Sequence, residues 1–240
     1  MRHDHRPYPF KRLQGAAEKF WADHFIDPQL ESMGAGGMIM KPWYLKVYGA
    51  GISFGEAVHV ITARDRTVRL TTWAHDAGAG RIQVMDYALL CPGVRIDSAT
   101  SVTIGKSTML AAGAYITDAD WHGIYDRPRP IGKTAAVCLS ENVWIGDGAT
   151  VCKGVTIGAN TIVGAGAVVT KSLPANVIAA GNPAVVVREL DPQEALRRRQ
   201  ELLQDHENLN RDIDLLERAL RKDNGWLNWL RSIIAPGRND

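Results

Sequence analysis

The chain has 240 residues, of which 45% are hydrophobic and 22% are charged, a composition typical of soluble globular proteins. At roughly 150 residues per domain, this length predicts one sizeable core with appendages rather than two equal domains. The apolar runs are well short of the roughly 20 residues that a membrane-spanning helix needs. A disordered chain and an integral membrane protein are therefore excluded.

Charge and cysteine content exclude further classes. The 28 Lys and Arg against 26 Asp and Glu leave a net charge of +2, and no segment concentrates basic residues as nucleic-acid binding requires. We therefore expect no nucleic-acid partner. Cys91, Cys138 and Cys152 form no CxxC pair and fit neither a disulfide framework nor a zinc knuckle, which predicts a reducing compartment. The N-terminus is charged where a signal peptide would be apolar, so we expect a cytoplasmic protein.

The first 41 residues predict a helical extension and a flexible joint. Apolar side chains recur at three- and four-residue spacing over residues 10–26, which indicates a helix that Asp27-Pro28 ends. The sequence GAGG at Gly34 to Gly37 then predicts the joint.

Residues 42–190 contain a six-residue repeat. Aliphatic residues stand six apart over one long run and two shorter ones: Leu139, Ile145, Val151, Ile157, Val163 and Val169; Val84, Leu90 and Ile96; Ile104, Leu110 and Ile116. A six-residue step does not fit an α-helix, but it suits short strands joined by tight turns, with one aliphatic side chain per strand pointing inward. The alternative is a β-sandwich of short strands. The long in-phase run favours a chain wound into a triangular prism.

This block resembles the hexapeptide-repeat acyltransferases. The resemblance is carried by NVWIGDGATVCKGVTIGANTIVGAGAVVT (Asn142 to Thr170), AAGNPA (Ala179 to Ala184) and DADWH (Asp118 to His122). These segments are most similar to the galactoside, maltose and xenobiotic O-acetyltransferases, especially members that modify surface polysaccharides. The resemblance implies a mainly β protein with a left-handed parallel β-helix, acetyl-CoA as acyl donor, no metal, and a homotrimer in which each catalytic loop reaches a neighbouring coenzyme site.

His122 is the candidate catalytic base. The repeats stop at Ile116 and resume at Leu139, so residues 117–138 are expected to leave the prism as a loop with His122 near its base. Its position and context also match the family's catalytic histidine. An imidazole has a pKa near the working pH and can take the proton from an attacking hydroxyl.

The expected reaction is direct transfer in a ternary complex. The thiolate of coenzyme A leaves readily, and no cysteine stands in the electropositive, exposed context of a nucleophile. A carboxylate or carbonyl on the far ring nitrogen would fix the tautomer of His122. Asp118 and Asp120 are the nearest carboxylates in the sequence, and the sequence does not choose between them.

The family resemblance also assigns a coenzyme site. The matching acetyl-CoA contact positions are Asp147, Ala165, Thr170, Lys171 and Arg188. Lys171 and Arg188 would serve the phosphates as cations. One position departs from the family pattern, since Val185 stands where that branch has a second Arg.

The acceptor is expected to be a hydroxyl of a sugar or glycan. Trp121, Tyr125, Asp126 and Arg127 follow the histidine region and suit two roles equally: contact with a sugar ring, or packing against a neighbouring subunit. The sequence names neither the acceptor nor the length of the acyl group.

Two other functions compete with acyl transfer. A metal enzyme of the γ-carbonic anhydrase type needs three histidines converging on zinc, and His59, His75 and His122 lack the paired spacing. A non-catalytic scaffold would use the helical C-terminus as its working part, but the long loop that carries His122 disfavours it.

Residues 191–240 predict a helix and an apolar tail. The sequence DPQE at Asp191 to Glu194 is a capping-box start, and an apolar seam runs on to Gly225. The seam consists of Ala195, Leu202, His206, Leu209, Ile213, Leu216 and Leu220, interrupted by Arg199. It suits either a short coiled coil or a helix lying on the prism. The tail WLNWLRSIIA (residues 226–235) suits trimer packing or peripheral contact with a membrane interface.

Overall fold

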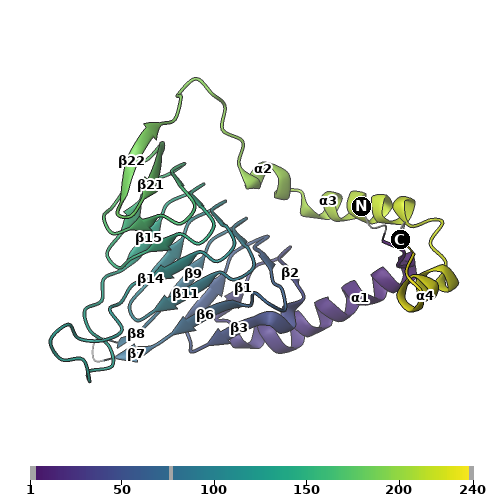
Figure 1. Ribbon diagram of the computed structural model, residues 1–240, viewed down its shortest axis with the longest axis horizontal. Coiled ribbons are helices and arrows are strands. Elements are labelled where there is room, and N and C mark those ends of the chain that lie inside the picture. The colour runs from purple at the N-terminus through teal and green to yellow at the C-terminus, as the bar shows by residue number, and fades with distance from the viewer. Residues whose placement is uncertain (1–3, 76–77, 238–240) are drawn as a thin grey trace.

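The computed structural model describes residues 4–75 and 78–237 and consists mainly of parallel strands, with helices at the two ends of the chain (Figure 1). The helices are α1 (Tyr8–Trp21), α2 (Arg199–Leu203), α3 (His206–Leu220) and α4 (Trp226–Ile234). A π-helical turn (Ala22–Ile26) and a 3-10 turn (Asp27–Gln29) extend α1, so the expected helix over residues 10–26 begins slightly earlier and changes its winding before Pro28. No helix in these two ranges is long and apolar enough to cross a membrane.

Apart from the short antiparallel pair β7 (Ala74–His75) and β8 (Gly78–Ala79), the strands visit three sheets in rotation, so the chain winds as a three-sided coil. The first sheet contains β1 (Ser32–Met33), β4 (Ile52–Phe54), β9 (Ile82–Val84), β12 (Val102–Ile104), β15 (Val137–Leu139) and β18 (Thr156–Ile157). The second sheet contains β2 (Met38–Met40), β5 (His59–Ile61), β10 (Leu89–Leu90), β13 (Met109–Leu110), β16 (Trp144–Ile145), β19 (Ile162–Val163), β21 (Val177–Gly181) and the antiparallel β22 (Ala184–Glu189). The third sheet contains β3 (Leu45–Tyr48), β6 (Val68–Thr72), β11 (Arg95–Ser98), β14 (Tyr115–Thr117), β17 (Thr150–Val151) and β20 (Val168–Val169).

The six-residue repeat sets the geometry of this coil. Leu139 pairs with Ile157 and Ile145 with Val163, so one full coil spans 157 − 139 = 18 residues, or three six-residue steps. All the in-phase aliphatics of the long run are fully buried along the axis of the coil. The predicted inward position of these side chains is therefore confirmed, and the core is one continuous column.

The first coil begins before residue 42. Strands β1 and β2 already pair with β4 and β5, so the sheets start at Ser32. The GAGG segment is a packed corner of this coil rather than a flexible joint. A Cβ on Gly34 would overlap the backbone of Gly55. Gly36 has a left-handed φ of 71°, and a Cβ there would overlap the ring of His206. Glycine is used here for close approach and left-handed backbone rather than for flexibility.

The helix expected from Asp191 is wrong, because the helical part begins only at Arg199. Asp191 instead closes a turn, accepting hydrogen bonds from the backbone N–H of Gln193 and of Glu194. The segment after β22 crosses back to the first coils before α2 forms (Figure 1). Extended chain covers roughly 3.3 Å per residue and a helix only 1.5 Å, so the need to span this distance overrides the local capping signal.

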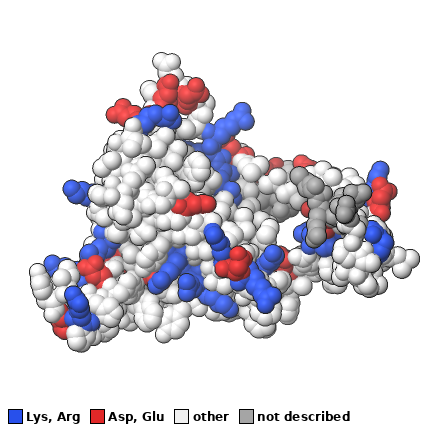
Figure 2. Space-filling view, in the orientation of Figure 1, with Lys and Arg blue, Asp and Glu red and all other residues white. Residues whose placement is uncertain are grey.

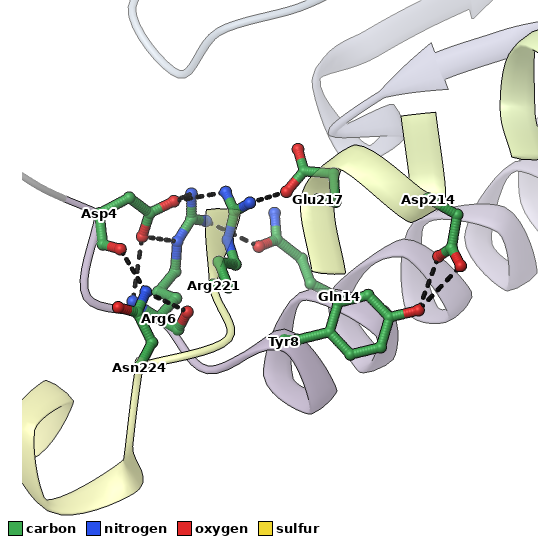
Figure 3. Close-up of polar contacts among 8 residues, drawn as sticks. All are labelled: Asp4, Arg6, Tyr8, Gln14, Asp214, Glu217, Arg221 and Asn224. Carbon is green, nitrogen blue, oxygen red and sulfur yellow. Dashed lines mark hydrogen bonds and ion pairs between the residues drawn. The ribbon is translucent and has the colours of Figure 1, made fainter. Parts of the chain in front are cut away.

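Helices α1, α3 and α4 form an arm that projects beyond the coil (Figure 1). Polar contacts join its parts, as Figure 3 shows: the Tyr8 hydroxyl donates to Asp214 at 2.8 Å, and Arg221 pairs with Asp4 at 2.9 Å. In the apolar tail, Trp229 packs against Phe10 with ring centroids 4.5 Å apart. The other apolar side chains of α4 are exposed: Trp226, Leu227, Leu230, Ile233 and Ile234.

Candidate active site

The loop that carries His122 leaves the coil at the corner between the third and the first sheet, where β14 ends and β15 has yet to begin. Its two arms pair at the base: the N–H of Asp120 donates to the carbonyl of Lys133 at 2.9 Å, and that of Gly132 to the carbonyl of Asp120 at 2.7 Å. A Cβ on Gly132 would lie 2.5 Å from the carbonyl oxygen of His122. Glycine is thus required where the arms cross beside the histidine, and the base of the loop is fixed.

Asp118 anchors the loop to the preceding coil. Its carboxylate is fully buried and accepts hydrogen bonds from the Ser98 hydroxyl at 2.7 Å and from the N–H groups of Ala99 at 2.7 Å and Thr100 at 2.8 Å. Three such donors offset the cost of burying a charge. The position of His122 therefore depends on a carboxylate that the coil itself holds.

Asp120 is engaged outside the core. It forms an ion pair with Lys153 at 2.7 Å, which ties the loop to the corner of the next coil. Both carboxylates that the sequence offers as partners of His122 are thus committed elsewhere. Among the described residues, neither forms a hydrogen bond with the imidazole, whose partner is of the other kind that the sequence left open, a carbonyl.

A backbone carbonyl orients His122 instead. The Nδ1 atom lies 2.9 Å from the carbonyl oxygen of Arg127. Because a carbonyl only accepts hydrogen bonds, Nδ1 carries the proton and Nε2 keeps its lone pair. The imidazole is exposed. In the neutral imidazole, Nε2 is therefore the nitrogen that is able to accept a proton.

A pocket of about 180 Å³ lies on the outer face of the third sheet, beside the loop. Its lining residues come from β6, β11 and the segments that follow the strands: Arg69, Thr71, Trp73, Arg95, Asp97 and Trp121. The rings of Trp73 and Trp121 are 6.1 Å apart, and the indole N–H of Trp121 donates to the Tyr115 hydroxyl at 3.2 Å. The residue directly before His122 therefore forms part of the pocket wall.

The polar floor of this pocket is held by Asp97. This buried carboxylate accepts a hydrogen bond from the Thr71 hydroxyl at 2.6 Å and pairs with Arg95 at 2.5 Å. The hydrogen bond that Arg95 donates to Asp97 raises the pKa of the Arg95 guanidinium, which also lies 4.8 Å from the centre of the Tyr115 ring. Burial raises the pKa of Tyr115. Arg95 is thus fixed in place and its charge is compensated.

The sequence singled out only one residue of the pocket. Trp121 lines it, whereas Tyr125 and Arg127 are exposed, and Arg127 serves His122 through its backbone carbonyl. The residues it missed are Arg69, Thr71, Trp73, Arg95 and Asp97. The sequence signals only that these side chains alternate with apolar residues, whereas the register that pairs Arg69 with Arg95 and Thr71 with Asp97 appears only in the structure.

The expected coenzyme positions fall into three groups. Asp147 and Ala165 occupy stacked turns at the corner between the second and third sheets, where the N–H of Gly166 donates to the Asp147 carbonyl at 2.8 Å. Thr170 and Lys171 are exposed at the corner from which the loop leaves, and Arg188 is exposed on β22 of the second sheet. The two corners flank the third sheet, while Arg188 lies apart from them on the same strand as the exposed Val185.

Two of the three cysteines differ from catalytic nucleophiles. Burial raises the pKa of Cys91 and of Cys152, which lowers their thiolate fraction. Among the described residues, no group of three or more His, Cys, Asp or Glu side chains is placed to hold a metal ion.

Comparison with known proteins supports the family resemblance. The family model described as bacterial transferase hexapeptide (six repeats) matches residues 139–171. The putative lipopolysaccharide biosynthesis O-acetyl transferase WbbJ of Escherichia coli is 34% identical over 126 residues, covering 48% of this chain and 61% of the relative. The galactoside O-acetyltransferase of the same organism is 36% identical over 96 residues, covering 39% and 47%. The chain thus spans about half to three fifths of these relatives.

A solved structure shows the same fold. The N-acyltransferase AntD from Bacillus cereus, in complex with dTDP-4-amino-4,6-dideoxyglucose and coenzyme A, matches with a TM-score of 0.57 at 18% identity. The match covers 76% of this chain and 92% of that structure. The chain is thus similar to hexapeptide-repeat transferases in its repeat over residues 139–171, in sequence to these two relatives, and in fold to this structure.

Proposed function

We propose that this chain is an acetyl-CoA-dependent O-acetyltransferase that acts on a hydroxyl group of a sugar or glycan. The observation that carries the proposal is His122, whose Nδ1–H is held by the Arg127 carbonyl so that Nε2 remains a base, next to a pocket walled by two indoles. The names of WbbJ and of the galactoside O-acetyltransferase support both the reaction and the class of acceptor.

In the proposed mechanism, Nε2 of His122 takes the proton from the acceptor hydroxyl as its oxygen attacks the thioester carbonyl. The Arg127 carbonyl keeps its hydrogen bond to Nδ1 and stabilises the imidazolium that forms. When the tetrahedral intermediate collapses, the imidazolium returns the proton to the departing thiolate of coenzyme A. Transfer is direct, and no residue of the chain carries the acetyl group.

We assign acetyl-CoA to the corners that flank the third sheet. Asp147 and Ala165 would contact the coenzyme at the corner between the second and third sheets. Thr170 and Lys171 would contact it at the other corner, from which the loop leaves. Lys171 and Arg188 serve the phosphates, and Val185 contributes no charge there. Small side chains at these corners allow the pantetheine arm to lie close to the backbone.

The proposal extends to the finer architecture. The coil is a left-handed β-helix that forms the acyltransferase domain from its first strand at Ser32 to about residue 190, with a helical N-terminal extension before it and residues 191–240 as the C-terminal segment. Three copies form a homotrimer in the cytoplasm, and a neighbour completes the site around the exposed imidazole of His122. The tail over residues 226–235 keeps both of its expected roles, packing in the trimer or contact with a membrane surface.

Substitution of His122 tests the function. We expect His122→Ala to lower the rate of acetyl transfer by about a hundred- to ten-thousand-fold, the usual effect of losing a general base, while coenzyme A binding and the fold persist. His24→Ala, on the exposed turn after α1, is the matched control and should keep full activity. Near wild-type turnover in the His122 variant would refute the assignment. A wild-type protein that fails to bind coenzyme A in a titration would instead favour the scaffold function.

A further inference from the structure

Three basic side chains stand side by side on the outer face of the third sheet. The register pairs Lys46 on β3 with Arg69 on β6, and Arg69 with Arg95 on β11. All three are exposed, because their neighbours along each strand point into the core. In Figure 2, Lys and Arg side chains gather over the part of the coil where Figure 1 places these three strands.

Such a row is unfavourable unless its charge is compensated. Neighbouring strands are roughly 4.8 Å apart, and like charges directly opposite each other destabilise a sheet. Asp97 and Tyr115 compensate Arg95 alone. Arg69, between the two other cations, has no ion pair or hydrogen bond of its side chain within the described part of the chain. The middle of this row of three cations, one strand in from the edge of the sheet, thus carries an uncompensated positive charge.

The pocket joins this charge to the loop that carries the proposed base. Arg69 lines the pocket together with Trp73 and Trp121, and Trp121 directly precedes His122. A volume of about 180 Å³ is below the roughly 300–1,000 Å³ of sites for larger ligands, which suits one sugar ring rather than a long glycan. Two indoles suit the apolar faces of such a ring, and a guanidinium suits a carboxylate or phosphate on it.

We propose that the acceptor is an acidic sugar, whose ring lies against Trp73 and Trp121 and whose carboxylate or phosphate binds Arg69. This inference rests on the proposed acetyl transfer and adds the charge of the acceptor to it. Arg95 is already committed to Asp97, so Arg69 is the residue that selects an acidic ring over a neutral one. Lys46, next to it on β3, strengthens the positive field.

The test compares a matched pair of acceptors, methyl β-D-glucoside and methyl β-D-glucuronide, in acetyl transfer from acetyl-CoA. We expect the wild-type enzyme to prefer the glucuronide in kcat/KM. Arg69→Gln should lower kcat/KM for the glucuronide by about 10- to 100-fold, the effect of losing a charge-assisted hydrogen bond, and leave the glucoside within about twofold. Methyl glucoside 6-phosphate is the third acceptor and distinguishes a phosphate from a carboxylate ligand.

Two variants serve as controls. Arg64→Gln removes the same charge from an exposed position in the turn before β6 and should leave all three acceptors unaffected. Arg69→Lys keeps the charge and should restore part of the preference. An equal rate on neutral and acidic sugars, or an equal loss on both in Arg69→Gln, overturns the inference while leaving acetyl transfer intact.

Sugar binding, followed through tryptophan fluorescence, separates this inference from the proposed function. If no acceptor is acetylated, the proposed function fails, and the binding data still decide whether the pocket prefers an acidic sugar. Tighter binding of the glucuronide that is lost in Arg69→Gln then supports an acidic-sugar site, and equal binding of the two sugars contradicts it.

Discussion

At the scale of single residues, two nearby carboxylates in the loop have different tasks because their surroundings differ. Asp118 is buried and holds three hydrogen-bond donors from the turn of the preceding coil, whereas Asp120 is partly exposed and forms one ion pair with Lys153. A buried acceptor surrounded by donors is costly to alter, while a partly exposed ion pair contributes little. The position of His122 should therefore depend on Asp118 far more than on Asp120.

We expect Asp118→Asn to lower the free energy of unfolding by about 2–4 kcal/mol, because an amide accepts through one oxygen only and its NH₂ group would face N–H donors. Acetyl transfer should fall as well, since the loop loses its anchor. Asp120→Asn should cost about 0–1 kcal/mol. Urea unfolding of the two variants measures this difference, and equal losses would contradict the anchoring role.

The sequence predicted the location of the catalytic candidate but not the contacts that define it. His122 could be identified from the sequence because it lies in a long interruption of a regular repeat. The partner of its Nδ1 is a backbone carbonyl, which every residue has and no residue type signals. Asp97 and Arg69 were hidden for another reason: they lie far from His122 in the sequence, and only the register of the third sheet brings their strands beside the loop.

At the scale of elements, polar side chains join the helices of the arm to one another and to the N-terminal segment. Tyr8 on α1 meets Asp214 on α3, and Arg221 contacts both Asp4 and Glu217 (Figure 3). In the heptad-spaced seam of α3, Leu209 is partly buried against Leu203, whereas three further side chains are exposed: Ile213, Leu216 and Leu220. A narrow apolar stripe with this spacing is typical of a coiled coil. The seam is thus suited to the same helix in other copies of the chain.

Two adjacent leucines test this role. Leu216 lies on the seam and Leu215 lies off it, yet their exposed fractions are 58% and 57%. We expect Leu216→Lys to shift dissociation of the proposed trimer to about 10- to 100-fold higher protein concentration, because a buried contact with the neighbouring copies is lost. Leu215→Lys should leave the assembly unchanged. Analytical ultracentrifugation compares the two variants, and identical behaviour would exclude the seam from the interface.

At the scale of the whole molecule, the C-terminal segment returns to the first coils and packs against them. Leu203 is buried against Ala57 and Tyr87, and the Arg199 guanidinium donates to the Tyr87 carbonyl at 2.9 Å. The guanidinium also lies 3.3 Å from Nδ1 of His59. Burial, followed by the charge of Arg199, lowers the pKa of His59 from its usual value of 6.5 to about 4. The contact thus requires His59 to be neutral.

This requirement predicts a dependence of stability on pH. The unfolded chain protonates His59 as the pH falls below about 6.5, whereas the folded chain resists protonation until about 4, so stability is complete above this window and decreases through it. Allowing for partial solvent exposure, we expect a melting temperature lower by about 2–4 °C at the acidic end, equivalent to about 1 kcal/mol. His59→Gln should reduce this loss between pH 6.5 and 4. An unchanged pH profile in the variant would exclude His59 as its source.

The overall architecture was largely predictable because each copy of the six-residue repeat indicates the same coil geometry. One misread hexapeptide does not change the period, and the family resemblance covered the same residues. The terminal segments lack this redundancy. The capping signal at Asp191 predicts a helix, but the distance that the chain must cross keeps this segment extended. The glycines at Gly34 to Gly37 predict a joint, but packing of the first coil fixes them as a corner.

The 18-residue coil also limits how the length of the chain can vary. Lys153, which pairs with Asp120, and Lys171, expected to bind a phosphate, are 171 − 153 = 18 residues apart and occupy the same corner. Inserting one hexapeptide between them would rotate Lys171 onto another face, whereas inserting a whole coil would shift it along the axis by about 4.8 Å at the same corner. Deletions and insertions there should therefore be tolerated only in whole coils. The loop between β14 and β15 can change length without moving Lys171 to another corner.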